Sequence, residues 1–343
     1  MTSQQSMTGA SPQRILEAIN AHQRSAILKA GIDLGVFTAI DEGYESVPAL
    51  AERCATSERG MRMLADGLAI LGFLTKDENH YGLMPDSKAF LVSSSPTYLG
   101  GTVDFMLSAP LYDGFRHLTE AVRKGGTALD EKGTTAEEHP EWVTFAQAMV
   151  PMMMPPAKWI AHHLSEQAQQ GEPVKKVLDI AAGHGMFGIE IGKAFPEAVI
   201  VGLDSAPVLE VAKKNAQAAS LGDRYQTIAG NAFTIDFKSD YDLILLPNFL
   251  HHFDAETCVS LLRKVHASLH PNGRVITVEF VPHEDRVSPS SADFALIMLV
   301  TTPGGDAYTF MELDRMFRAG GFPRSEMFAV PESKEHVLIS YKN

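Results

Sequence analysis

Residues 176–188 read KVLDIAAGHGMFG, and this stretch decides the fold class of the chain. An apolar run reaches Asp179 and is followed by Gly183, Gly185 and Gly188, as where a buried strand passes through a tight glycine turn into a helix. The glycines alone also fit a dinucleotide-binding turn. Asp179 argues against that ligand, because a carboxylate at the strand end would repel a pyrophosphate. A positively charged ligand is favoured at this turn.

The sequence after residue 172 alternates between strand-like and helix-like segments. Four of the strand-like segments are apolar nearly throughout, as expected when helices cover both faces of a parallel sheet. We therefore predict an α/β, doubly wound domain over residues 172–343. The segments, in chain order, are KVLDIAA, a helix from about Met186, AVIVGLD, PVLEVAKKNAQAAS, YQTIAG, YDLILLP, ETCVSLLRKVHASL and RVITVEFV.

Polar residues follow the first three of these strands in order. Asp204 ends the second strand, at the edge of the same crevice as Asp179, where a carboxylate can accept both hydroxyls of a ribose. Gly230-Asn231-Ala232-Phe233 ends the third strand and offers an amide and an aromatic ring for an adenine. S-adenosylmethionine has a sulfonium, an ammonium, a ribose and an adenine, so it fits this series better than NAD. The predicted cofactor-binding residues are Asp179, Gly183, Gly185, Asp204, Asn231, Ala232 and Phe233.

The N-terminal region, residues 1–100, has the pattern of a winged helix. Three helical segments, at 22–40, 46–55 and 57–73, precede the hairpin-like stretch LTKDENHYGLMP. Residues 1–100 contain eight lysine and arginine residues and eleven aspartate and glutamate residues. The resulting net charge of −3 disfavours DNA binding. We expect its apolar helices to pack on another protein surface, in a homodimer.

Residues 101–171 are predicted to be a helical linker that also contributes to a substrate pocket. Polar residues and helix breakers at 169–173 mark the expected main boundary. Methionines at helical spacing are the candidate walls of the pocket, although such methionines are often core residues. They are Met149, Met152, Met153, Met154 and Met298.

Composition narrows the function classes further. The net charge of −13 disfavours nucleic acid and anionic membrane surfaces as partners. The longest apolar run, 294–300, is too short to span a bilayer, and the polar N-terminus lacks a secretion signal, so we expect a cytoplasmic protein. Two distant cysteines and the absence of clustered ligand spacing predict no metal site.

Two histidines, His251 and His252, follow the strand YDLILLP, at the edge where ligands of α/β sheets bind. A phenol is mostly protonated at neutral pH, and a histidine can take its proton. His251 is therefore a candidate general base. The alternative is that His251 only caps the following helix while His252 faces solvent.

The stretches VLDIAAGHG, VGLD, GNAF, LPNFLHHF and GRVITVEF, behind a winged helix, resemble S-adenosylmethionine-dependent O-methyltransferases of the plant caffeate type and their bacterial natural-product relatives. The resemblance covers nearly the whole chain. It implies a seven-stranded class I methyltransferase sheet, an N-terminal dimerisation domain and methylation of a hydroxyl on a small, often aromatic molecule. Ala181 departs from the family's glycine loop, and Asn231 stands where an aspartate is usual.

The resemblance also assigns the catalytic residues. It aligns His251 with the family's base, His252 with the aspartate that follows it, and Glu279 with a carboxylate that orients the base. A second family glutamate would fall at Ala307, so Asp306 is the candidate substitute. Asn248 stands where the family often has a tryptophan beside the substrate. The predicted substrate residues are Met149, Met153, Asn248, His252 and Met298.

Two other functions remain open from the sequence. One is C- or N-methylation of a small metabolite, which would need no histidine base. The other is a non-catalytic, cofactor-binding winged-helix regulator, against which the acidic winged helix and the His251–Glu279 pair both argue.

Overall fold

The computed structural model describes residues 11–136, 139–168 and 174–343. The chain forms two compact units, one ending at Val103 and the other running from Asp104 to Asn343. The boundary expected at 169–173 lies outside the described residues. In the second unit α11 (Val150–Ala168) packs against α12 (Met186–Ala194), so most of the helical region 101–171 belongs to the same unit as the sheet.

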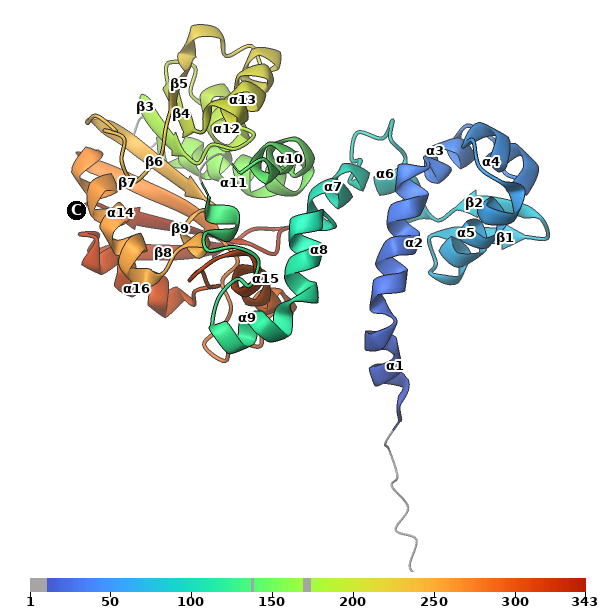
Figure 1. The fold of residues 1–343 in the computed structure, drawn as a ribbon. Coiled ribbons are helices and arrows are strands. Elements are labelled where there is room, and N and C mark those ends of the chain that lie inside the picture. The colour runs from blue at the N-terminus through green and yellow to red at the C-terminus, as the bar shows by residue number, and fades with distance from the viewer. Residues whose placement is uncertain (1–10, 137–138, 169–173) are drawn as a thin grey trace, which may run out of the picture. The chain divides into compact units, whose positions relative to one another are not determined.

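The N-terminal unit has the expected helical segments and hairpin, together with two further helices at 13–19 and 85–91 (Figure 1). The predicted helix over 22–40 is two helices, because Gly35 adopts a left-handed conformation, φ 69°. Ser57 accepts a hydrogen bond from the Gly60 N–H and begins the fifth helix. The elements are α1 (Gln13–Ile19), α2 (Ala21–Asp33), α3 (Val36–Asp41), α4 (Val47–Arg53), α5 (Glu58–Ile70), β1 (Leu74–Asp77), β2 (His80–Leu83), α6 (Pro85–Leu91) and η1 (Gly100–Thr102).

Large apolar side chains stay exposed on this unit although its core is closed. The core includes the fully buried Phe37, Leu50 and Leu68. Most of the exposed ones lie on α1, α5 and α6, namely Ile15, Leu16, Ile19, Met63, Ile70 and Phe90.

The second unit contains the predicted seven-stranded α/β sheet, which is thereby confirmed. The strand order is β5-β4-β3-β6-β7-β9-β8. The sheet is not wholly parallel, because β9 runs antiparallel to both its neighbours. Its strands are β3 (Lys176–Ile180), β4 (Val199–Asp204), β5 (Tyr225–Ala229), β6 (Tyr241–Pro247), β7 (Leu269–Glu279), β8 (Arg324–Ala329) and β9 (His336–Tyr341).

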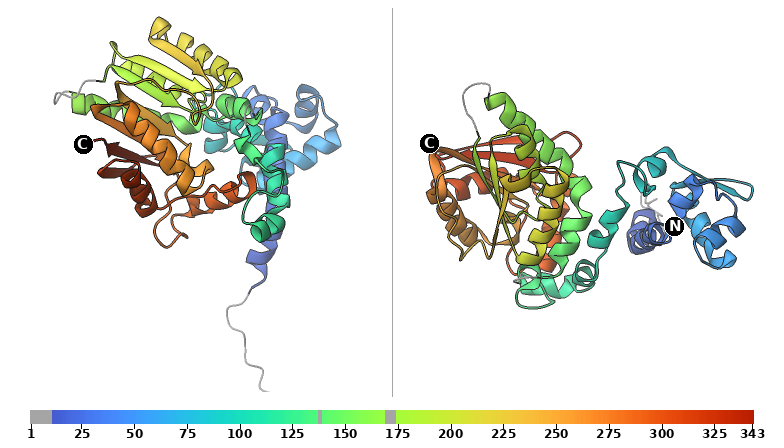
Figure 2. Two further views of the ribbon diagram at one scale, coloured as in Figure 1. Left: turned by 60° about the vertical axis from the view of Figure 1, so that its left-hand side comes forward. Right: turned by 90° about the horizontal axis from the view of Figure 1, so that it is seen from above.

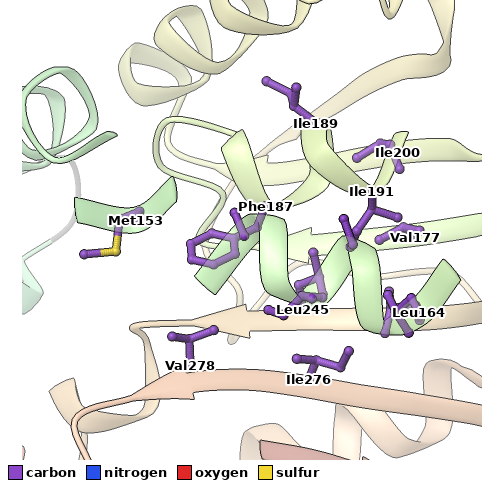
Figure 3. Packing of buried hydrophobic residues seen from close by; sticks show 14 of the residues in the cluster. Met153, Leu164, Val177, Phe187, Ile189, Ile191, Ile200, Leu245, Ile276 and Val278 are labelled. Carbon is purple, nitrogen blue, oxygen red and sulfur yellow. The ribbon is translucent and has the colours of Figure 1, made fainter. Parts of the chain in front are cut away.

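Helices cover both faces of this sheet (Figure 2). One core lies between the sheet and α11 and α12, and Figure 3 shows side chains of this core, with Met153 at the left of the view. The other core lies against α14 and α16. The remaining elements are α7 (Val103–Met106), α8 (Ala109–Arg116), α9 (Leu118–Lys124), η2 (Gly133–Thr135), α10 (Glu141–Ala148), α13 (Ala206–Ala218), η3 (Gly222–Arg224), η4 (Leu250–His252), α14 (Ala255–Ser268), η5 (Ser290–Asp293), α15 (Phe294–Thr301) and α16 (Phe310–Ala319).

The topology brings the chemically active residues to one edge. The parallel strands β3, β4, β5, β6 and β7 all end there, and the antiparallel β9 begins there. Among the helices that the structure describes, none is long and apolar enough to cross a membrane.

Candidate active site

Three residues of the glycine loop after β3 have a left-handed backbone conformation. They are Ala181, Gly183 and Gly185, with φ values of 55°, 56° and 75°. A Cβ on Gly185 would lie 2.6 Å from the Tyr225 hydroxyl, so this position requires glycine for packing as well. Ala181 holds the same conformation with a methyl group, at a cost of roughly 1–2 kcal/mol.

Asp179 is fully buried beneath this loop. Its Oδ2 accepts the N–H of Gly188 at 3.1 Å, while its Oδ1 has no hydrogen-bond partner within the described part of the chain. Burial raises the pKa of Asp179 to about 8. A buried carboxyl oxygen without a partner fits a cationic or hydrogen-bond-donating ligand group.

Asp204 is tied to the same loop. Its carboxylate accepts the N–H of Gly183 at 2.9 Å and that of Ser205 at 2.7 Å. Burial raises its pKa, and these hydrogen bonds oppose the shift. Asp204 therefore joins the ends of β3 and β4.

The residues after β5 form a local turn with an aromatic side. Asn231 Oδ1 accepts the N–H of Phe233 at 2.9 Å, and the Ala232 carbonyl accepts from Lys264 at 2.8 Å. The Phe233 ring contacts Phe253 edge-on, with centroids 4.8 Å apart. Asn231 thus stabilises the turn that presents Phe233.

The His251–Glu279 pair lies at the ends of β6 and β7. His251 Nδ1 lies 2.5 Å from Glu279 Oε2, and Glu279 Oε1 accepts the N–H of Leu250 at 3.0 Å. Both side chains are buried. The carboxylate thereby fixes both the imidazole and the η4 turn that carries it.

Burial sets the charge state of this pair. It lowers the pKa of His251 and raises the pKa of Glu279, because a low-dielectric site disfavours either charge. One proton between Nδ1 and Oε2 satisfies both groups. His251 Nε2 is then left unprotonated and able to accept a proton.

The alternative in which His251 caps a helix and His252 faces solvent does not fit. Helix α14 is capped by Asp254, which accepts the N–H of Thr257 at 2.9 Å. His252 Nδ1 is buried, without a hydrogen-bond partner among the described residues. The rings of the two histidines are in contact, with centroids 4.3 Å apart.

Helix α10 adds aromatic residues that the sequence analysis did not single out. Trp142 contacts His252 edge-on, with ring centroids 5.0 Å apart. Phe145 stacks on His184 of the glycine loop at 6.3 Å, with 16° between the ring planes. One helix therefore contacts both the histidine pair and the glycine loop. The sequence signal was a tryptophan and a phenylalanine three residues apart, which a core helix shows equally.

The methionines that were candidate walls of the substrate pocket differ in their exposure. Met149, Met153 and Met298 are buried, whereas Met152 is exposed and Met154 is half-buried. Met149 and Met153 belong to the core between α11 and the sheet. Met153 also reaches the strand ends, where its sulfur accepts a hydrogen bond from Asn248 Nδ2 at 3.2 Å.

Asp306 is connected to His251 through its backbone. Its N–H donates to the His251 carbonyl at 3.0 Å, whereas its carboxylate pairs with Arg286 at 3.4 Å. The nearest charge to this carboxylate is thus a guanidinium. Nothing in these contacts gives Asp306 a proton-transfer role.

No group of three or more histidine, cysteine, aspartate or glutamate side chains in the described ranges is arranged to hold a metal ion.

Comparison with known proteins identifies the family. A family model described as the O-methyltransferase domain matches residues 115–323, more than half of the chain. A second model, the O-methyltransferase dimerisation domain, matches residues 16–93. The chain belongs to the O-methyltransferase family. The predicted resemblance is thereby confirmed, and the non-catalytic regulator finds no support.

Individual relatives of this O-methyltransferase can be aligned with it over nearly the full length of the chain. The 3-hydroxy-5-methyl-1-naphthoate 3-O-methyltransferase of Streptomyces sahachiroi is 25% identical over 313 residues, covering 90% of this chain and 89% of the relative. A crystal structure from Nostoc punctiforme, provisionally called an O-methyltransferase, is 50% identical, with a TM-score of 0.92 and coverage of 97% and 100%. Human N-acetylserotonin methyltransferase in complex with S-adenosylmethionine shares the fold, at 24% identity, a TM-score of 0.83 and coverage of 98% and 99%.

The residues present fit this cofactor. Among the described residues, Oδ1 of Asp179 beneath the glycine loop has no hydrogen-bond partner, and Asp204 accepts the N–H of Gly183 within that loop.

Proposed function

We propose that this protein transfers a methyl group from S-adenosylmethionine to a hydroxyl of a small, aromatic or polyketide-like molecule, with His251 as the general base. The observation that carries the proposal is the buried His251–Glu279 contact of 2.5 Å at the sheet edge. When bound, S-adenosylmethionine supplies a methyl group on a positively charged sulfur, open to attack by an oxygen nucleophile.

The protein's own part is to hold the acceptor and remove its proton. With Nδ1 engaged by Glu279, His251 offers Nε2 to the acceptor hydroxyl. As the imidazole becomes positively charged, the Glu279 carboxylate stabilises it. General-base assistance of this kind is worth on the order of 10²–10⁴ in rate.

Several side chains support binding at either end of the site. Asp179 and Asp204 would hold the cofactor's cationic and ribose groups. Trp142, His252 and Met153 form the apolar and aromatic surroundings on the acceptor side, which suit a planar molecule. The dimerisation domain match supports a homodimer formed through the N-terminal unit.

The test is transfer of a ¹³C-labelled methyl group from S-adenosylmethionine to hydroxynaphthoates and N-acetylserotonin, with the product examined by NMR. A methyl carbon bonded to oxygen is the expected result. Label found only on nitrogen or carbon would contradict the proposal and support the alternative methylation chemistries.

A further inference from the structure

The turn that carries His251 is also held by the loop between α15 and α16, residues 302–309. In this loop, the Asp306 N–H donates to the His251 carbonyl at 3.0 Å, and the Tyr308 hydroxyl donates to the Phe253 carbonyl at 2.6 Å. These two bonds restrain the main chain of η4 and of the residue after it. Glu279 contacts the imidazole ring, so the ring and the main chain of the base have separate supports.

Gly305 lies against the main chain of this turn and has no room for a side chain. A Cβ at Gly305 would overlap the carbonyl oxygen of His251 and would lie 2.9 Å from the carbonyl carbon of His252. Both atoms belong to the main chain, so they cannot turn aside as the end of a flexible side chain can. The Gly305 N–H donates to the buried Thr302 hydroxyl at 2.9 Å, and that hydroxyl donates to the Met298 carbonyl of α15 at 2.7 Å.

Other main-chain contacts restrain the loop itself. The Thr127 N–H donates to the Thr302 carbonyl at 2.9 Å. A Cβ at Gly126 would overlap the carbonyl oxygen of Pro303, so main chain packs directly on main chain here as well. Because the loop is held in this way, a methyl group added at Gly305 would displace the base turn.

We propose that Gly305 is a positioning residue for the general base: its lack of a side chain lets the loop lie against the main chain of His251 and so sets where Nε2 meets the acceptor hydroxyl. The inference rests on the proposed function, because it requires that His251 remove a proton. The loop then supplements Glu279, the carboxylate that contacts the imidazole, whereas the Asp306 carboxylate pairs with Arg286.

The experiment uses the full-length protein with 2-naphthol as the probe acceptor. Gly305→Ala should lower kcat by roughly 10–100-fold, because a displacement of about 1 Å at a reacting group can cost about 10²-fold in rate. KM for 2-naphthol and the affinity for S-adenosylhomocysteine should each change less than about threefold, since the methyl group is added behind the base.

The pH profile separates a misplaced base from a damaged fold. The kcat loss should shrink as the pH approaches about 10, where a phenol ionises without a base. A general structural defect would lower kcat equally at every pH, and that result would overturn the proposal. The substitution leaves the titratable side chains around the turn in place, namely Glu279 of β7, His252 of the turn itself, Cys258 of α14 and Asp306 of the loop.

Gly304→Ala is the matched control, because it adds the same methyl group one residue earlier. A Cβ there would have its closest contact at 3.6 Å, with the Asp254 Cβ, which is an ordinary van der Waals distance. Neither glycine has a positive φ, so alanine strains the backbone at neither position. Gly304→Ala should keep kcat within about twofold of wild type. Equal kcat losses in the two alanine variants would overturn the proposal.

A second variant tests the same support without adding any atom near the base. Thr302→Val has nearly the same shape as the wild type but removes the hydroxyl that accepts the Gly305 N–H. It should lower kcat for 2-naphthol about tenfold, with the same recovery at high pH, because that buried N–H loses its partner. Thr302→Ser keeps the hydroxyl and should restore most of the rate. A wild-type kcat in Thr302→Val would contradict the positioning role.

A further measurement needs no acceptor. The proton between His251 Nδ1 and Glu279 Oε2 lies in a short hydrogen bond of 2.5 Å, so it should give a far-downfield ¹H NMR signal that is absent in His251→Ala. This signal should shift in Gly305→Ala and stay unchanged in Gly304→Ala. An unchanged signal in Gly305→Ala would overturn the proposal. If wild type does not methylate 2-naphthol, phenol methylation fails as the proposed function, while this signal still decides the role of Gly305.

Discussion

Glu279 holds His251 from two directions, because its Oε2 lies 2.5 Å from Nδ1 while its Oε1 accepts the N–H of the preceding Leu250 at 3.0 Å. Rotation of the imidazole and movement of the turn are thus restrained by one carboxyl group. Thr277, on the same strand, donates to the Leu246 carbonyl at 2.5 Å and keeps the two strand ends together. The imidazole is therefore oriented before any acceptor arrives, and this fixed geometry would favour the proposed proton transfer.

His251→Ala should lower kcat by roughly 10²–10⁴ for a phenolic acceptor, because the proton then has no base to accept it. S-adenosylhomocysteine binding should remain nearly intact, since His251 is not among the groups proposed to hold the cofactor. Steady-state kinetics together with calorimetry measures both quantities. Higher pH should partly restore the variant, because the phenol ionises near pH 10 without help.

His252→Ala is the matched control for that experiment. It removes the neighbouring imidazole, and with it the contact to Trp142, but leaves the Glu279 contact in place. Its kcat should fall much less than that of His251→Ala. Equal turnover in wild type and His251→Ala at neutral pH would remove the base assignment and point to C- or N-methylation.

Glu279→Gln should give a kcat between those of wild type and His251→Ala. Glutamine can keep one hydrogen bond to the turn, but it has no negative charge to stabilise the imidazolium. KM should change little, because Glu279 is buried behind the base. A kcat equal to that of wild type would show that the carboxylate's charge has no part in catalysis.

Asp179 should make cofactor binding depend on pH. Its pKa is raised to about 8 by burial, so the free protein holds it protonated below that pH, whereas a bound ammonium favours the carboxylate. Binding below pH 8 therefore releases a proton, and S-adenosylhomocysteine affinity should rise with pH by up to about tenfold per unit until pH 8. Calorimetric titrations between pH 6 and about 8.5 measure this slope.

Asp179→Asn should abolish that slope, since asparagine does not titrate. NAD should not raise the melting temperature of either protein, whereas S-adenosylhomocysteine should raise that of the wild type. A pH-independent affinity in the wild type would show that Asp179 does not face the cationic group. A thermal shift with NAD alone would contradict the cofactor assignment.

The full-length protein should be a dimer at micromolar concentration. The apolar side chains of Ile19 on α1 and Ile70 on α5 are more than half exposed in the single chain. The dimerisation domain match, residues 16–93, includes both of these residues. Sedimentation velocity gives the mass directly. Charged substitutions at Ile19 and Ile70 should shift the population toward monomer, whereas Glu52→Lys, at an exposed polar position, should not. A wild-type monomer would refute the homodimer.

Much of the sheet could be predicted from the sequence because its signals are local. Each buried parallel strand is a short apolar run, and Asp179 and Asp204 stand at the ends of two of them. The contact between His251 and Glu279 could not be predicted from local sequence, because these two residues meet only through the pairing of β6 with β7. The family pattern supplied that pairing, and the structure then supplied the 2.5 Å contact.

What escaped prediction depends on non-local packing. The start of β9 lies beside Glu279 because β9 inserts antiparallel between β7 and β8, and nothing in the sequence of the neighbouring strands marks that reversal. Asp306 was expected to serve the base through its carboxylate, but Arg286, twenty residues earlier, pairs with that carboxylate. The helix break at Gly35 differs from these two cases, because a glycine within a helical segment is a local sequence signal for a break.

Trp142 should report on the acceptor side of the site, and the chain provides its own control. The only other tryptophan, Trp159, stacks on His163 within α11, with ring centroids 4.8 Å apart. In a Trp159→Phe background, the fluorescence of Trp142 should change when a naphthol binds, because the acceptor enters beside the His252 ring that Trp142 contacts. In Trp142→Phe, the remaining signal from Trp159 should not respond.

Trp142→Leu should raise KM for the naphthol about tenfold while S-adenosylhomocysteine affinity stays within about twofold, since aromatic contacts are worth about 0.5–1.5 kcal/mol beyond the area they bury. If Trp159 alone responds, or if the leucine variant keeps the wild-type KM, α10 does not form the acceptor wall.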